Sequence, residues 1–301
     1  MHSAPLSLDP QTLSKLAGLQ LRARYIVDGY LSGMHRSAHY GQSVEFTEHR
    51  EYSQGDDLRY VDWKVYGKTD KVYLKRFEAE TNLVCYLLVD VSESMSYQSE
   101  GVALSKSQYA HCLAAALASL VLRQRDSVSL MTFDQDVREL VRASGNPAHW
   151  HQLVEVLERS RLERKSSLGK VLHEISQRLR CPGLVVVFSD LLGDTDSLIS
   201  GLKHLRHDRH ELLVLHLLDP AEVEFPFEHA TRFRGLERLS SVLTEPRGVR
   251  QAYLKELAQF VGRVEAACRS MQADYELLRS DESFGLSLER VLTKRRGGLR
   301  R

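Results

Sequence analysis

Three oxygen-bearing side chains follow a strongly apolar run in the first half of the chain. Residues 83–89 are mostly apolar and β-prone, and Asp90, Ser92 and Ser94 come directly after them. Side chains at alternate positions of an extended segment point the same way, so these three are expected to converge at the end of a strand. Hard oxygen groups are the ligands that Mg²⁺ prefers. The sequence therefore predicts a Mg²⁺ site, with Mn²⁺ or Ca²⁺ as alternatives.

Two other segments offer oxygen ligands of the same kind. Asp190 follows the apolar run 185–188, and Ser166 stands at the predicted start of a helix after the loop 161–165. Ligand sites in parallel sheets lie at the carboxyl ends of the strands, where both segments are expected. The predicted metal ligands are thus Asp90, Ser92, Ser94, Ser166 and Asp190. A purely local role is the alternative, because Asp and Ser are common in turns and helix caps.

The elements that must position these residues alternate between strand and helix from residue 81 onward. Strands are predicted at 83–89, 127–133, 137–141, 184–188, 211–218 and 274–278. Helices are predicted at 10–31, 106–123, 196–205 and 286–292, and a further long helix is predicted to begin at Pro246. The strand 137–141 is expected to pair antiparallel with 127–133 as a hairpin. This order predicts an α/β fold, a Rossmann-like, mostly parallel sheet with helices on both faces and an N-terminal elaboration.

Composition excludes several classes of protein. The 301 residues are 43% hydrophobic and 27% charged, with a formal net charge of +1, so bulk nucleic-acid binding is not expected. No apolar run approaches the ~20 residues of a membrane span, and no signal peptide is visible. The four cysteines form no Cys-x-x-Cys pair, as expected in a reducing compartment. We therefore expect a cytoplasmic protein.

The string Asp90-Val91-Ser92-Glu93-Ser94, with Asp190 after a later strand, resembles a known metal site. It is similar to the metal-ion-dependent adhesion site of von Willebrand factor type A domains, whose signature is Asp-x-Ser-x-Ser, a distant Thr and a distant Asp. Ser166 stands where that family has Thr, and it offers the same ligand oxygen with one methyl group less. The resemblance implies a cation whose coordination is completed by an acidic residue of a partner protein.

A second resemblance lies before this site. Residues 41–46 read GQSVEF, residues 50–64 read REYSQGDDLRYVDWK and residues 75–80 read KRFEAE. These strings resemble the bacterial family called "domain of unknown function 58", and residues 219–222 and 253–296 also fit it. The resemblance implies a short form without membrane helices. It also implies an adaptor for client proteins that works with a MoxR-type AAA+ ATPase in the assembly or maturation of complexes.

Residues 1–80 are predicted to form an N-terminal helix and a charged extended segment packed on the core, and residues 81–301 the von Willebrand factor A-like domain. The part from 45 to 80 places opposite charges close together. Five of these residues are expected to form a hydrogen-bonded clamp against the sheet, namely Asp56, Asp57, Arg59, Asp62 and Lys64. Partner recognition by the same segment is the alternative.

Catalysis has little support in the sequence. A phosphatase of the haloacid dehalogenase type needs a second Asp two residues after its nucleophile, and Ser92 stands at that position after Asp90. The chain has no Gly-x-Ser-x-Gly elbow and no glycine-rich phosphate loop of the P-loop or dinucleotide-binding type. We therefore expect a non-catalytic, Mg²⁺-dependent adaptor. The alternative is a metal-dependent, phosphatase-like hydrolase that uses Asp90.

Overall fold

The computed structural model describes residues 8–36, 49–51, 73–75, 83–162, 167–233 and 242–298. The chain forms two compact units, Met1–Gly33 with Leu83–Arg301, and Met34–Asn82. In the second unit, β1 (His49–Glu51) pairs antiparallel with β2 (Tyr73–Lys75). The predicted clamp of Asp56, Asp57, Arg59, Asp62 and Lys64 lies outside the described residues. The boundary between 1–80 and 81–301 stays a prediction.

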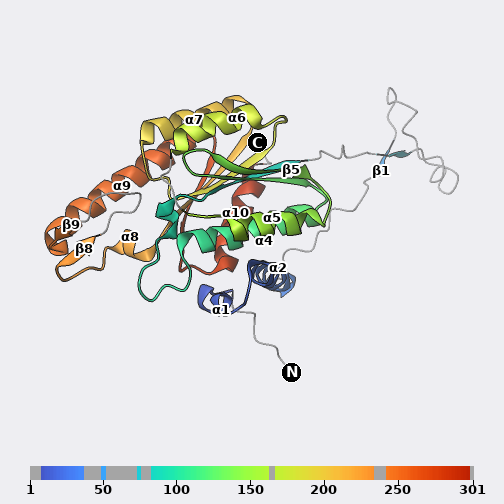
Figure 1. Ribbon diagram of the computed structural model, residues 1–301. Coiled ribbons are helices and arrows are strands. Elements are labelled where there is room, and N and C mark those ends of the chain that lie inside the picture. Colours follow the sequence, from blue (N-terminus) through green and yellow to red (C-terminus); the bar gives the residue numbers. More distant parts are fainter. Residues whose placement is uncertain are drawn as a thin grey trace. The chain divides into compact units, whose positions relative to one another are not determined.

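The larger unit is built on a six-stranded sheet with the order β10-β7-β6-β3-β4-β5 (Figure 1). Its strands are β3 (Val84–Asp90), β4 (Ser127–Phe133), β5 (Val137–Ser144), β6 (Leu184–Ser189), β7 (Glu211–Leu218) and β10 (Asp274–Arg279). Every neighbouring pair is parallel except β4 and β5, which form the predicted antiparallel hairpin. The predicted mostly parallel α/β sheet is confirmed.

The central strands are apolar throughout because both faces of the sheet are covered. In β3, the side chains of Cys85, Leu87 and Val89 enter one hydrophobic cluster, whereas Tyr86 and Leu88 enter the other. A strand that is buried on both faces needs a continuous apolar run rather than an alternating one. This explains why these segments stand out so clearly in the sequence.

Helices cover both faces of the sheet (Figure 1). One cluster includes side chains of α4 (Lys106–Arg123), α5 (His149–Arg159), α10 (Phe284–Gly298), α1 (Pro10–Ser14) and α2 (Leu19–Arg36). The other includes side chains of α6 (Leu168–Arg178), α7 (Thr195–His207) and α9 (Pro246–Ser270). Between β7 and α9 lie the short helix α8 (Pro220–Glu224) and the hairpin of β8 (Thr231–Phe233) with β9 (Val242–Thr244). Among the described residues, no helix combines the length and apolar character needed to cross a membrane.

The single helix predicted over residues 10–31 is wrong, because the chain turns between α1 and α2. Gly18 adopts φ of +79° there, a left-handed conformation that glycine reaches without a steric penalty. The turn brings Leu13 of α1 and Ile26 of α2, both fully buried, into the same hydrophobic cluster as the sheet. Burial of both apolar surfaces therefore outweighs the continuous helical periodicity.

Helices α6 and α7 approach each other closely through small residues. A Cβ atom placed on Gly169 of α6 would lie 2.1 Å from Ser197 Oγ and 2.5 Å from the Ser197 carbonyl carbon in α7. A Cβ atom on Gly201 of α7 would lie 2.9 Å from the Gly169 carbonyl oxygen. Both positions therefore lack room for a side chain, and the two helices pack backbone to backbone.

The chain order of the strands creates a switch point beside β3. From β3 the chain passes to β4 and β5 on one side, and it then crosses to β6 and β7 on the other side. The connections leave the carboxyl ends of β3 and β6 in opposite directions, which opens a crevice between them. Asp90 is the last residue of β3, and Asp190 directly follows β6.

Candidate metal-binding site

The site begins with two carboxylates at the ends of adjacent strands. Strand β3 ends at Asp90 and β6 ends at Ser189, one residue before Asp190. The two strands pair in parallel, with Val89 opposite Phe188. This register puts Asp90 level with Ser189, and all three polar residues are fully buried. The structure therefore brings Asp90 and Asp190 together, as the sequence predicted.

Asp90 accepts hydrogen bonds on both carboxylate oxygens. Its Oδ1 accepts from the Ser92 backbone N–H at 2.9 Å, and its Oδ2 accepts from the Ser189 hydroxyl at 2.6 Å. Burial, reinforced by the negative charge of Asp190, raises the pKa of Asp90 to about 7, and these hydrogen bonds offset only part of that rise. The carboxylate is thus held firmly but lacks compensating positive charge.

The two serines meet, although not through an extended backbone. Ser92 Oγ lies 3.1 Å from Ser94 Oγ. Residues Glu93–Ser96 form a 3₁₀ turn, η2, so the prediction of an extended segment through Ser94 is wrong. The turn buries Met95 completely, which favours it over a straight path. The Ser92 side chain makes no capping hydrogen bond to η2, so helix capping does not explain why a serine stands at this position.

Asp190 is held by three donors. Its Oδ1 accepts from the Leu192 N–H at 3.2 Å, its Oδ2 accepts from Lys106 Nζ at 2.9 Å, and the Ser94 side chain also bonds to it. Burial raises the pKa of Asp190, but the positive charge of Lys106 outweighs burial, and the net effect lowers it. Asp190 is therefore ionised, with a cation already beside it.

Lys106 is a component of the site that the sequence reasoning missed. It is the first residue of α4, and its ammonium group also donates to Glu222 Oε1 in α8 at 2.8 Å. Glu222 Oε2 accepts from the Asp219 N–H, and Asp219 in turn accepts from the Ser99 N–H. One signal was present in the sequence: a lysine directly after the N-cap serine of a Ser-x-x-Gln capping box, in the first helical turn where acidic residues are favoured.

The fifth predicted ligand, Ser166, lies outside the described residues. Its neighbour Ser167 occupies the N-cap position of α6 but makes no side-chain capping bond. The backbone N–H of Ser167 donates to the Asp134 carbonyl oxygen at 3.3 Å, just beyond the end of β4. The start of α6 therefore lies at the same edge of the sheet as Asp90.

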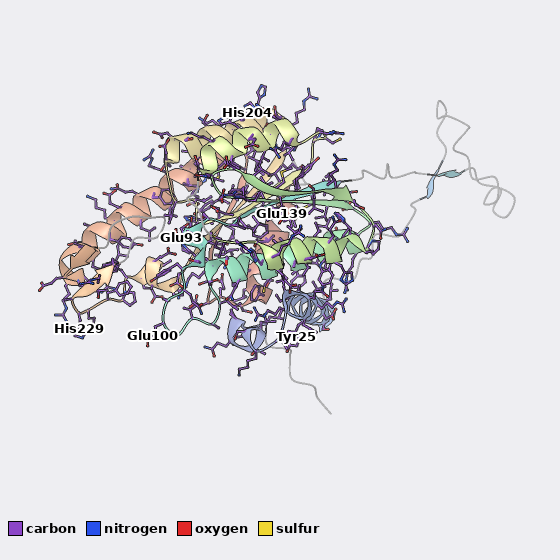
Figure 2. The ribbon with its side chains drawn as sticks, viewed as in Figure 1. Tyr25, Glu93, Glu100, Glu139, His204 and His229 are labelled. Carbon is purple, nitrogen blue, oxygen red and sulfur yellow. The ribbon has the colours of Figure 1, made fainter. Side chains whose placement is uncertain are left out.

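A cleft of about 340 Å³ is lined in part by Val91, the residue that follows Asp90. Its lining also includes residues from β4, β5 and the end of α5, among them Arg138, Arg159 and Arg161. Arg138 pairs with Asp134, and Arg159 pairs with Glu139 of β5. Figure 2 labels Glu139 of this cleft. It also labels Glu93, the residue between Ser92 and Ser94 in the sequence. Three guanidinium groups against two carboxylates give the cleft a basic lining.

The donor set fits a hard divalent cation. Within the described residues, no group of three or more His, Cys, Asp or Glu side chains is arranged to hold a metal ion. A cation here would use the hydroxyls of Ser92 and Ser94, with Asp90 and Asp190 supplying negative charge. Such all-oxygen sites suit Mg²⁺ better than Zn²⁺, which favours nitrogen and sulfur ligands.

The fold and its strand-end cluster define an α/β protein with a polar site at the switch point of its sheet. The sequence model described as "Protein of unknown function DUF58" matches residues 48–260. The chain therefore belongs to the DUF58 family, and the resemblance noted from the sequence is confirmed. The uncharacterized protein Rv1480 of Mycobacterium tuberculosis is 26% identical over 298 residues, covering 96% of this chain and 92% of the relative. Mb1516 of Mycobacterium bovis matches to the same extent.

The solved structures that match the chain are more distant in sequence. The conserved hypothetical protein BatB from Bacteroides thetaiotaomicron is 14% identical, with a TM-score of 0.45 over 70% of this chain and 98% of that one. An aerotolerance-related membrane protein from Bacteroides fragilis is 16% identical, with a TM-score of 0.45 over 70% of this chain and 99% of that one. The SpRpn10 VWA domain is 12% identical, with a TM-score of 0.40 over 70% of this chain and 95% of that one.

Proposed function

We propose that the chain is a non-catalytic, Mg²⁺-dependent protein-binding adaptor. The observation that carries the proposal is the convergence of Asp90, Ser92, Ser94 and Asp190 at the carboxyl edge of the sheet. Their arrangement supplies neutral hydroxyls next to two buried carboxylates. Neutral ligands leave a bound cation electrophilic, so it retains affinity for a carboxylate from another protein. Ser166, which precedes α6 in the sequence, is proposed as a further ligand.

The proposed partner group is an acidic side chain. The neighbouring cleft supports this choice, since its lining carries three arginines and two carboxylates. By family resemblance, the partner system is a MoxR-type AAA+ ATPase that acts on client proteins. The chemistry of the site argues against hydrolysis by Asp90, because Ser92 has no acidity suited to protonating a leaving group.

Calorimetry with Mg²⁺ tests the cation site. We expect binding by the wild type, and at least tenfold weaker binding by Asp90→Asn, which removes one negative charge from the site. Asp28→Ala is the matched control, because Asp28 is an exposed carboxylate on α2 that pairs only with the exposed Arg123 among the described residues. Equal heats for the wild type and Asp90→Asn would contradict the proposal.

Affinity capture from the source cell, with and without a chelator, tests the partner. An AAA+ ATPase that is captured in Mg²⁺ and lost on chelation supports the adaptor function. An ATPase retained despite chelation would instead assign the contact to another surface, such as residues 45–80. Turnover of a phosphate ester by the wild type that is abolished by Asp90→Asn would refute the non-catalytic proposal.

A further inference from the structure

Lys106 is the most deeply buried cation near the site. Its side chain has no solvent exposure, and its ammonium group bridges Asp190 of the strand-end site and Glu222 of α8. The two oxygen atoms lie 2.9 and 2.8 Å from Nζ. Neither Lys106 nor its two carboxylate partners belong to the residues that line the basic cleft.

Two features make this position costly for a lysine. Moving an ammonium group out of water is unfavourable unless it is closely paired. In addition, Lys106 is the first residue of an 18-residue helix, where the helix dipole disfavours positive charge. The two carboxylate partners offset both costs and raise the pKa of Lys106 above its usual range. A residue that opposes local preference so clearly points to a role in the site.

The balance of charge indicates what that role is. Two carboxylates share the Lys106 ammonium group, the fully buried Asp190 and the largely buried Glu222. The buried Asp90 adds a third negative charge next to Asp190. A divalent cation at the site would be attracted by Asp190 and repelled by Lys106. Like charges repel each other more strongly in the protein interior than in water, because the interior screens them less.

We propose that Lys106 is a positioning residue that competes with a divalent cation for Asp190 and thereby keeps the affinity of the site low. This inference rests on the proposed cation site and deepens it. A weakened site binds its cation firmly only when a carboxylate from a partner adds negative charge, so Lys106 makes cation binding and partner binding depend on each other. Glu222 shares the ammonium group with Asp190 and so limits how strongly Lys106 opposes the cation.

Two substitutions with opposite expected effects test this role. Lys106→Met keeps the length of the side chain and removes its charge, so Mg²⁺ should bind at least tenfold more tightly than to the wild type. Glu222→Gln leaves Asp190 as the only carboxylate bonded to Lys106, so Mg²⁺ should bind at least threefold more weakly. Gln retains the capping hydrogen bond to the Asp219 N–H. Lys203→Met on α7 is the control, because Lys203 is exposed.

The measurements are the dissociation constant for Mg²⁺ and the melting temperature with and without Mg²⁺. Mg²⁺ should raise the melting temperature of Lys106→Met more than that of the wild type. A purely structural lysine would lower the melting temperature equally in both conditions and leave the dissociation constant unchanged, which overturns the inference. If Lys106→Met does not fold, an unchanged dissociation constant for Glu222→Gln overturns it.

The outcomes separate this inference from the proposed function. Mg²⁺ binding by the wild type with no change in either variant retains the cation site and rejects the role of Lys106. Binding by Lys106→Met but not by the wild type supports the competition and rejects a Mg²⁺ site in the unmodified protein. Absence of binding by all variants rejects both.

Discussion

Asp90 should destabilise the metal-free protein at neutral and alkaline pH. Its pKa is raised from 3.8 to about 7, first by burial and then by Asp190. Because the pKa of Asp90 is higher in the folded state, the stability that the protonated carboxyl contributes is fully present below pH 3.8 and is lost as the pH rises through 7. Three pKa units correspond to about 4 kcal/mol of unfolding free energy.

The substitution Asp90→Asn removes this penalty while keeping the size of the side chain. It disturbs the hydrogen bonds from Ser189 and the Ser92 N–H, at a cost of about 2 kcal/mol. At pH 8 the variant should therefore be more stable than the wild type by about 2 kcal/mol. At pH 5 most of the wild-type penalty is absent, and the two proteins should differ by about 0 kcal/mol.

Urea denaturation in the presence of a chelator measures this difference across pH 5 to 8. Adding Mg²⁺ at pH 8 should raise the unfolding free energy of the wild type, because the positive charge of the cation offsets the buried negative charge of Asp90. The unfolding free energy of Asp90→Asn should stay nearly unchanged. The reasoning is refuted if Asp90→Asn is less stable than the wild type at pH 8 by as much as at pH 5. That result would show that the buried carboxylate carries no electrostatic penalty.

Three further predictions concern the rest of the fold. Gly169→Ala should lower the unfolding free energy by about 1–3 kcal/mol in urea denaturation, since its Cβ would meet the Ser197 backbone, whereas Gly248→Ala, with open space around it, should not. Burial lowers the pKa of His216 to about 4. The stability that the neutral His216 contributes is therefore fully present above pH 6.5 and is lost as the pH falls toward 4. Between pH 6.5 and 4, the unfolding free energy of His216→Gln should therefore fall by about 3 kcal/mol less than that of the wild type. Parallel pH profiles of the unfolding free energy for the two proteins would contradict this. A thiol reagent should label only the exposed Cys181 of the native protein, and rapid labelling of Cys112 would contradict its burial.

Much of the core could be predicted from the sequence. The predicted boundaries of α4, β4 and β7 agree with the structure, and α9 begins at Pro246 as expected. These elements are long, and they are bounded by polar or proline residues. Periodicity and burial therefore act in the same direction, which is the condition under which local patterns are reliable.

Local patterns failed where tertiary contacts opposed them. The helical spacing over residues 10–31 continues across Gly18, but burial of Leu13 and Ile26 in one cluster requires a turn there. The alternation of Ser92 and Ser94 predicted an extended segment, but burial of Met95 requires the turn η2. In both places a long-range apolar contact outweighs a local preference of smaller free energy.

The sequence by itself determined where β3 and β6 end, because apolar runs that stop before Asp90 and before Ser189-Asp190 are readable without a fold. Only the tertiary structure decided that these strands are neighbours and that a buried lysine stands between the site and α8. Lys106 is separated by 84 residues from Asp190 and by 116 from Glu222. No local pattern connects groups so far apart along the chain. Their pairing follows from the crossover of the sheet and from the cost of burying an unpaired charge.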